Sequence, residues 1–176
     1  MEAYVALLRA VNVGGKNKLP MKSLSAHCEA QGCNQVQTYI QSGNVVFRAS
    51  AKVAAALPAK LKAQIKEEFG FETTVILRGA AELLAVTKNN PFAPEHTHVI
   101  FLAGKPNLTD VVKLNPPCAD GEAFSLRGNE IFLCLPNGGG RSKLATYGFD
   151  KVLRTAGSMR NWRTVLQLLA LTETTR

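Results

Sequence analysis

The sequence predicts an α+β protein built from tandem ferredoxin-like plaits, that is, two consecutive split β-α-β units. Apolar periodicities in the first half follow the order β-α-β-β-α-β, and a similar series begins again near residue 97. In addition, 46% of the 176 residues are hydrophobic and 19% are charged, a composition that supplies a self-sufficient core.

Each element of the first half has a local signal. The apolar run from Ala3 to Leu8 is typical of a buried strand, and the apolar spacing after Pro20 indicates a helix that ends before Gly32. Two apolar runs flank a Ser-Gly turn, which predicts a hairpin, and Pro58 suits the first position of a helix. In chain order the sequence predicts strand 3–8, loop 9–20, helix 21–31, hairpin strands 36–40 and 45–47, helix 58–69, strand 73–77 and helix 80–87.

The second half repeats this order with one change at its end. Residues 89–96 contain Pro91 and Pro94 and are predicted to connect a first half, 1–88, to a second half, 97–176. The last apolar pattern is helical, so we expect the second plait to end in an extra helix in place of its last strand. The predicted elements are strands 98–102, 123–126 and 131–135 and helices 108–114, 142–154 and 159–171.

A short internal repeat supports duplication. Residues 43–47 and 128–132 share the pattern Gly-Asn-x-aliphatic-Phe at a spacing of 85 residues, and both fall at the turn between the second and third strands. The first half is longer between its first strand and this turn, and the additional residues form the loop RAVNVGGKNKLP, 9–20. A long basic loop present in only one half is where a function is expected.

The net charge of +8 is concentrated in the two terminal parts of the chain. Residues 1–48 carry five basic and two acidic side chains, 49–126 carry eight of each, and 127–176 carry eight basic and three acidic. Localised positive charge indicates surfaces that attract phosphate, nucleic acid or an acidic partner, although a solvated basic face without a ligand gives the same counts.

The predicted topology brings the 9–18 loop and the 41–44 turn to one edge of the first sheet. The cations, amides and glycines gathered there suit an anion, and no carboxylate is among them. The alternative is that the glycines only form a tight turn and the lysines are solvated. The expected binding residues are Arg9, Asn12, Gly14, Gly15, Lys16, Asn17, Lys18, Gln41, Ser42, Gly43 and Asn44.

Two further basic segments lie in the second half. Arg141 and Lys143 follow three consecutive glycines and open a predicted helix capped by Ser142, an arrangement that suits phosphate or forms a flexible connection. Arg160 and Asn161 lie in the first turn of the last predicted helix, with Ser158 as the expected N-cap and Trp162 as a core anchor.

Several classes of protein are disfavoured by the sequence. The four cysteines form no CxxC pair and are expected to be free thiols, while His27, Cys28 and Cys33 lack the further ligands of a zinc site. We expect no metal, because the nominated loops contain no Asp or Glu, and we expect no cofactor. The first residues resemble neither a signal nor a transit peptide, and no long apolar stretch occurs, so we expect a cytoplasmic protein without a membrane segment.

Five segments together resemble a bacterial domain-of-unknown-function family, number 1697. They are YVALLRAVNVGGKNKLPM, TYIQSGNVVF, the central NPF, HVIFLAGKP and MRNWRTVLQL, and the similarity spans nearly the whole chain. The resemblance implies a tandem ferredoxin-like structure and brings no established activity. Ala10 stands where this family more often has Gly. The positions marked by the resemblance are Arg9, Asn12, Gly14, Gly15, Lys18, Gln41, Ser42, Gly43, Asn44, Arg160, Asn161 and Trp162.

Three functions follow from these patterns and stay open at this point. The first is binding of a small phosphate-type or nucleotide-type anion at the 9–18 loop and 41–44 turn. The second is single-stranded nucleic-acid binding through the plait, although residues 42–47 lack the exposed aromatic pair of RNA-recognition sheets. The third is a metal-independent group-transfer enzyme acting on a phosphorylated substrate. A structural or protein-interaction role is a further possibility, and the sequence determines neither catalysis nor oligomeric state.

Overall fold

The computed structural model describes residues 1–174 and has an α+β fold. These residues form two four-stranded antiparallel sheets and six helices. The chain divides into two compact units: unit 1 comprises Met1–Leu84 together with the chain from Gln167 onward, and unit 2 comprises Ala85–Leu166. The α+β class predicted from the sequence is therefore confirmed.

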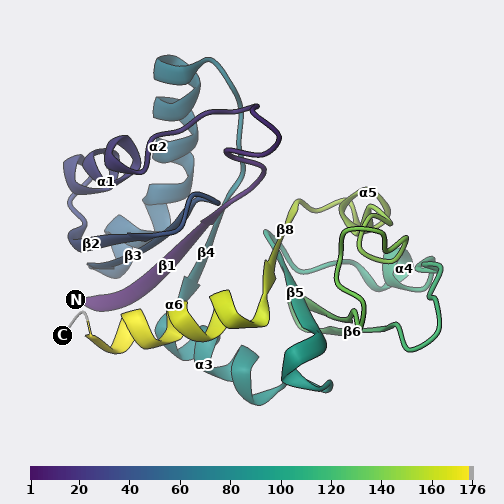
Figure 1. Cartoon of the computed structure of the whole chain (residues 1–176). Helices are drawn as coiled ribbons and strands as arrows, with labels where there is room; N and C mark the ends of the chain where they lie inside the picture. Colours follow the sequence, from purple (N-terminus) through teal and green to yellow (C-terminus); the bar gives the residue numbers. More distant parts are fainter. Residues whose placement is uncertain (175–176) are drawn as a thin grey trace. The chain divides into compact units, whose positions relative to one another are not determined.

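Unit 1 contains the first sheet, whose strand order is β2-β3-β1-β4 with every neighbouring pair antiparallel. Helices α1 and α2 lie on one side of this sheet (Figure 1). The elements are β1 (Glu2–Leu8), α1 (Met21–Ala30), β2 (Asn34–Tyr39), β3 (Asn44–Ala49), α2 (Ala51–Phe69), β4 (Val75–Gly79) and the start of α3 (Ala80–Lys88).

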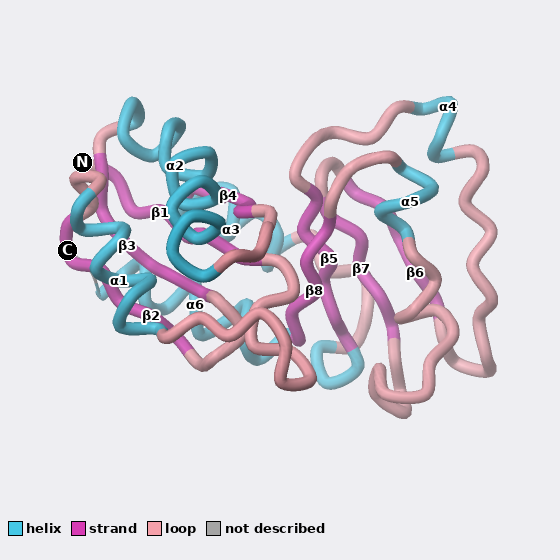
Figure 2. Tube along the Cα trace, turned by 90° about the horizontal axis from the view of Figure 1, so that it is seen from above, coloured by secondary structure: helices cyan, strands magenta, loops and turns pink. Residues whose placement is uncertain are grey.

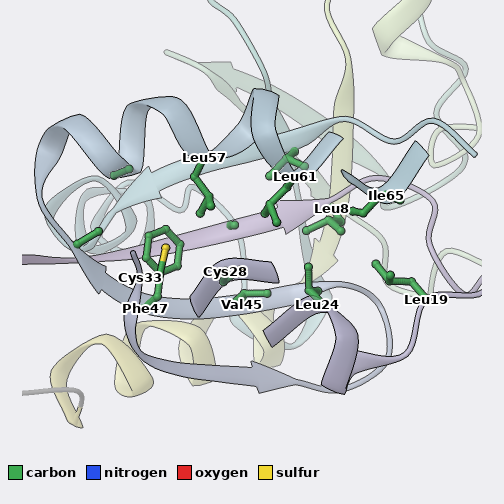
Figure 3. Packing of buried hydrophobic residues seen from close by; sticks show 14 of the residues in the cluster. Leu8, Leu19, Leu24, Cys28, Cys33, Val45, Phe47, Leu57, Leu61 and Ile65 are labelled. Atoms are coloured by element: carbon green, nitrogen blue, oxygen red, sulfur yellow. The ribbon is translucent and has the colours of Figure 1, made fainter. Parts of the chain in front are cut away.

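Alternate residues of β1 and β3 enter the core beneath the two helices. Leu8 and Phe47 are fully buried in one apolar cluster with Leu24 of α1 and Leu61 of α2 (Figure 3). Period-two alternation places these strand residues on the helix-covered face of the sheet. Leu19, at the end of the 9–20 loop, is only 1% exposed and belongs to the same cluster, so the core holds the loop at its far end.

Helix α2 begins seven residues before the position that the sequence predicted. Ser50 is its N-cap, and the Ser50 hydroxyl accepts a hydrogen bond from the backbone N–H of Val53 at 3.3 Å. Pro58, the expected first residue, lies inside the helix. The prediction was wrong because it weighted the proline above the serine cap, whereas the alanine-rich segment after Ser50 favours helix.

Unit 2 contains the second sheet, whose strand order is β6-β7-β5-β8, again with antiparallel neighbours (Figure 2). Its apolar cluster includes residues of α4 and α5 packed on β5 and β7. After the end of α3 the elements are η1 (Pro94–His96), β5 (Thr97–Leu102), α4 (Leu108–Val111), β6 (Ala123–Arg127), β7 (Glu130–Cys134), α5 (Phe149–Leu153), β8 (Gly157–Asn161) and α6 (Trp162–Thr174).

The prediction that the second half ends in a helix in place of its last strand is wrong. Gly157–Asn161 forms β8, which pairs with β5. The inward positions of β8 are occupied by Ser158 and Arg160, while Met159 is more exposed than either. Hydrophobicity therefore does not reveal this strand, because its buried positions are polar. The cap of α6 is also not Ser158: the Asn161 Oδ1 atom accepts from the backbone N–H of Thr164 at 2.8 Å.

The helix predicted at 142–154 is reduced to Phe149–Leu153, and the one at 108–114 to Leu108–Val111. In the first case Ser142 and Thr146 compete with helical backbone bonding. The Ser142 hydroxyl accepts from the Ala145 N–H at 3.1 Å, and the Thr146 hydroxyl donates to the Ser142 carbonyl at 3.1 Å. Such local side-chain bonds stabilise turns in place of a helix.

The repeated Gly-Asn-x-aliphatic-Phe pattern marks corresponding turns but not corresponding strand positions. Phe47 pairs with Tyr4 of β1, and Phe132 pairs with Val99 of β5. In the second sheet Val99 occupies the position that Val5, and not Tyr4, has in the first sheet. A shift of one residue reverses the face of a strand. Phe47 accordingly lies in the cluster under α1 and α2, whereas Phe132 is absent from the cluster under α4 and α5.

Asp110 links the two short helices of unit 2. Its carboxylate is 1% exposed and accepts two hydrogen bonds from Arg154, at 2.9 and 3.0 Å, and one from Lys113 at 3.0 Å. The hydrogen bond from Lys113, followed by those from Arg154, lowers the pKa of Asp110. A lowered carboxyl pKa stabilises the folded state above the unfolded pKa, and this contribution is lost as the pH falls through the folded one.

None of the helices between Met1 and Thr174 combines the length and apolar character needed to span a bilayer.

Burial sets the reactivity of the four thiols, none of which is in a disulfide. Burial raises the pKa of Cys28 to about 12 and that of Cys33 to about 11. At pH 8 both are protonated, and only the thiolate reacts.

With a thiol-specific chromogenic disulfide, we expect immediate reaction of the exposed Cys118 and reaction of Cys28 and Cys33 only after denaturation. Cys118→Ser should remove the fast phase, and rapid labelling of Cys28 in native protein would contradict this.

Candidate functional site

The end of β1 lies between the β2–β3 turn and the residues that lead into β4. The Leu8 N–H donates to the Gly43 carbonyl at 2.8 Å, and the Arg9 N–H donates to the Thr74 carbonyl at 2.9 Å. The structure thus brings the predicted loop and turn together at one edge of the sheet.

Asn12 fastens the loop to the turn with three hydrogen bonds from one side chain. Its Nδ2 atom donates to the Gln41 carbonyl at 2.8 Å and to the Leu19 carbonyl at 2.9 Å, and its Oδ1 atom accepts from the Leu19 N–H at 2.8 Å. Together these bonds employ both donor hydrogens and the acceptor of the amide. Asn12 therefore positions the site and is not available as a ligand-binding amide.

Residues 12–17 form a miniature hairpin. The Asn12 N–H donates to the Asn17 carbonyl and the Lys16 N–H to the Val13 carbonyl, both at 3.0 Å. Gly14 and Gly15 have φ angles of 57° and 74°, as a type I′ turn requires. The Asn17 Nδ2 atom donates to the Ala10 carbonyl at 2.9 Å, which ties the second arm of the hairpin to the start of the loop.

Left-handed backbone is concentrated here. Ala10, Asn12, Asn17 and Ile40 have φ between 49° and 54°, and within residues 1–174 only Gln35 and Arg154 join them among non-glycine residues. This conformation is unfavourable for alanine and more so for a β-branched residue. Backbone strain of this kind often accompanies functional sites. The left-handed φ angle of Ala10 also explains why a glycine would suit position 10.

The 41–44 turn is built from side chains with structural roles. Asn44 is fully buried, and its Nδ2 atom donates to the Tyr39 carbonyl at 3.0 Å and to the Ser42 hydroxyl at 2.9 Å. A Cβ atom on Gly43 would lie 2.6 Å from Cγ2 of Val11 and 2.8 Å from Cβ of Leu8, so only glycine fits. Gln41 contributes its backbone carbonyl, and its side chain is exposed.

A polar hollow of about 210 Å³ opens beside the base of the loop. It is lined by Arg9 and Ala10, by Lys62 of α2, and by the segment Glu72, Thr73 and Thr74. The Thr73 hydroxyl donates to the Arg9 carbonyl at 2.7 Å. Glu72 bonds to Lys66 at 2.6 Å; this bond, and then the charge of Lys62, lower the pKa of Glu72, which stays ionised.

Lys62 and residues 72–74, which include a carboxylate, lie outside the site that the sequence predicted. The signal was available, because β4 runs antiparallel beside β1 and its first residues reach the edge where β1 ends. The expected site without carboxylates therefore needs a correction: Glu72 and Arg9 both line this hollow.

Helix α1 begins directly after the loop. Its N-cap is Pro20, which makes no side-chain capping bond, and no acidic residue occurs in its first turn. The N–H groups of a first helical turn lack intrahelical partners and carry partial positive charge. Lys18 and Lys22 flank this helix start, so the electrostatic environment is positive.

The predicted residues of unit 2 occupy different settings. Arg141 and Lys143 are exposed, but a carboxylate is close to them: a hydrogen bond from Ser142, followed by one from the Ala119 N–H at 2.9 Å, lowers the pKa of Glu122. No long helix starts at Ser142, so the expected helix-end anion site is not formed. This glycine-rich loop offers less to an anion than the sequence indicated.

Arg160 is 7% exposed and donates to the Ser158 hydroxyl at 2.7 Å and to the Met159 carbonyl at 2.9 Å. Burial lowers the pKa of Arg160 to about 10. Asn161 caps α6 as described above. Both residues have structural roles in unit 2, and Trp162, 7% exposed, is buried as expected. In residues 1–174 no three His, Cys, Asp or Glu side chains converge in a way that could hold a metal ion.

The protein has two antiparallel four-stranded sheets, each packed against helices, and a basic loop held by hydrogen bonds. Proteins of this α+β class have many different functions. The family model described as "Protein of unknown function (DUF1697)" matches residues 1–132, and the chain belongs to this family. The resemblance found in the sequence is thereby confirmed. The conserved bacterial protein SP0830 from Streptococcus pneumoniae has a similar structure, with a TM-score of 0.75 and 22% identity over 97% of this chain and 98% of that one. This likeness shows the fold alone, and no curated protein matches the chain.

Replacing Ala10 with glycine should stabilise unit 1. Ala10 is exposed at φ 54°, where glycine lacks the steric penalty. We expect Ala10→Gly to raise the free energy of unfolding by about 0.5–1 kcal/mol in urea titrations. As a control, Ala59→Gly in the exposed interior of α2 should lower it by about 1 kcal/mol. If both variants lower the free energy of unfolding by the same amount, the left-handed backbone at position 10 carries no strain.

Removing the Asn12 side chain should loosen the loop. Asn12→Ala leaves the Gln41 carbonyl and both backbone groups of Leu19 without their partner. We expect a loss of about 2 kcal/mol in the free energy of unfolding. Gln37→Ala, on an exposed position of β2, should change it by less than about 0.5 kcal/mol. If the two variants are equally stable, the three hydrogen bonds do not hold the loop.

Proposed function

We propose that this protein binds a small phosphate-type anion at the 9–18 loop and the adjoining turn. The binding groups are the side chains of Arg9, Lys16 and Lys18 together with the exposed backbone of Gly14 and Gly15. Asn12, Asn17, Ser42, Gly43 and Asn44 shape the site without contacting the ligand.

One observation carries this proposal: the loop is held rigidly while its cations remain exposed. Val11 and Leu19 are each 1% exposed and anchor the loop on both sides, and Asn12 ties it to the turn. A loop that merely reverses the chain needs neither these anchors nor several left-handed residues. Pre-organisation reduces the entropy lost when a ligand binds, and this supports a binding role.

The start of α1 supports the same ligand class. It adds unpaired N–H groups and a favourable dipole for negative charge at the end of the loop. Residues 9–18 themselves contain no carboxylate, and Glu72, which lines the hollow with Arg9, is hydrogen-bonded to Lys66.

We also propose that the two halves are tandem ferredoxin-like plaits, with sequence units 1–88 and 97–176. The identical strand orders and the β-α-β-β-α-β-α series in each half support this duplication. A cytoplasmic location belongs to the proposal, and the four free cysteines support a reducing compartment.

Nucleic-acid binding through the first sheet receives less support. Phe47 is fully buried and Tyr4 packs against the same cluster, so neither ring is presented as a stacking platform. No geometry specifically favours the group-transfer alternative.

Calorimetric titration with inorganic phosphate and with ATP tests the proposed function. The double variant Lys16→Ala/Lys18→Ala should weaken binding by about a hundredfold or more, because it removes two cations and each charged hydrogen bond contributes about 1.5–3 kcal/mol. The double variant Lys52→Ala/Lys60→Ala removes the same charge from exposed positions of α2 and should leave affinity unchanged at fixed ionic strength. Equal weakening in both double variants would indicate only general charge attraction, and tight binding of single-stranded RNA alone would favour the nucleic-acid function.

A further inference from the structure

We infer that the hollow beside Arg9 receives the phosphate end of a sugar phosphate, a monoester whose organic part carries hydroxyl groups. The inference rests on the proposed anion function and names the class of ligand. It assigns Lys62 and Glu72, which lie outside the 9–18 loop and the 41–44 turn, to the site.

The size of the hollow limits what enters it. Sites that enclose a drug-sized molecule measure about 300–1,000 Å³, whereas this hollow measures about 210 Å³. It accommodates one phosphate group with a short attached stem, and the remainder of the ligand extends toward the surface.

Three segments fix the walls of the hollow. The Arg9 N–H is bonded to the Thr74 carbonyl, and the Arg9 carbonyl accepts from the Thr73 hydroxyl, so the backbone beneath Arg9 is held on both sides. Thr73 is 5% exposed. Lys62 approaches from α2, a 19-residue helix whose neighbouring residue Leu61 is fully buried. The two cations therefore project from fixed supports.

The charges in the hollow select a monoester. Arg9 and Lys62 supply two positive charges, and a guanidinium can bind phosphate oxygens in pairs. Glu72 supplies one negative charge that Lys66 partly neutralises at 2.6 Å. An ionised carboxylate repels further phosphate groups and accepts hydrogen bonds from hydroxyl groups. The combination favours one phosphate beside a hydroxylated carbon chain over free phosphate or a polyphosphate.

Calorimetric titration with glucose 6-phosphate, inorganic phosphate and ATP tests this ligand class. The unaltered protein should bind glucose 6-phosphate at least several-fold more tightly than inorganic phosphate. Lys62→Ala should weaken both by roughly tenfold, whereas Lys60→Ala, on the same helix and outside the hollow, should have no effect. Glu72→Ala, which removes both the charge and the hydrogen-bond acceptor, should remove the preference for glucose 6-phosphate and strengthen binding of ATP. Lys62 and Glu72 are exposed, so these variants should fold, and thermal melting will verify it.

The outcomes separate this inference from the proposed function. If Lys16→Ala/Lys18→Ala weakens phosphate binding and Lys62→Ala does not, the loop binds anions and the hollow is not the site. If Glu72→Ala leaves the order of affinities unchanged, the assignment of a sugar phosphate is wrong. If none of the three compounds binds to the unaltered protein, the proposed function fails and the inference fails with it.

Discussion

The contact between the 9–20 loop and the turn before β3 determines most of what is distinctive in unit 1. At Gly43 the backbone lies so close to Val11 and Leu8 that a Cβ atom could not be accommodated, and Asn12 spans the same junction with its amide. The close apolar packing at Gly43 excludes water from the hydrogen bonds of Asn12. These hydrogen bonds in turn hold the backbone at the distance that the packing needs. The exposed hairpin at 12–17 depends on this junction for its position.

Polar residues in this region accordingly divide into two groups with different tasks. The short amides, Asn12, Asn17 and Asn44, bond to backbone carbonyls and maintain conformations that apolar residues would not adopt. The long cations Arg9, Lys16 and Lys18 extend from the resulting frame, and Lys62 extends from α2 toward the hollow. A conservative exchange of asparagine should therefore alter the shape of the site, whereas exchange of a lysine should alter its charge alone.

Much of this arrangement is readable from the sequence, and the failures have specific physical causes. Apolar periodicity identified β1, α1, the β2–β3 hairpin and their meeting at one sheet edge. It missed β8 because Ser158 and Arg160 occupy its inward positions, and it misplaced the start of α2 because the cap at Ser50 was outweighed by Pro58. Residues 72–74 were overlooked although antiparallel pairing of β4 with β1 puts them beside Arg9. The tight packing at Gly43 depends on atomic distances, which no pattern of residue types contains.

The borders of the two compact units lie within helices: one falls inside α3, between Leu84 and Ala85, and the other inside α6, between Leu166 and Gln167. Unit 1 is thus discontinuous in sequence and includes the fully buried Leu168. Synthesis on the ribosome must reach the last helix before unit 1 has all of its parts, even though its sheet is complete by Gly79. A gene fragment that ends after the first half would encode every strand of that sheet and still lack part of the unit.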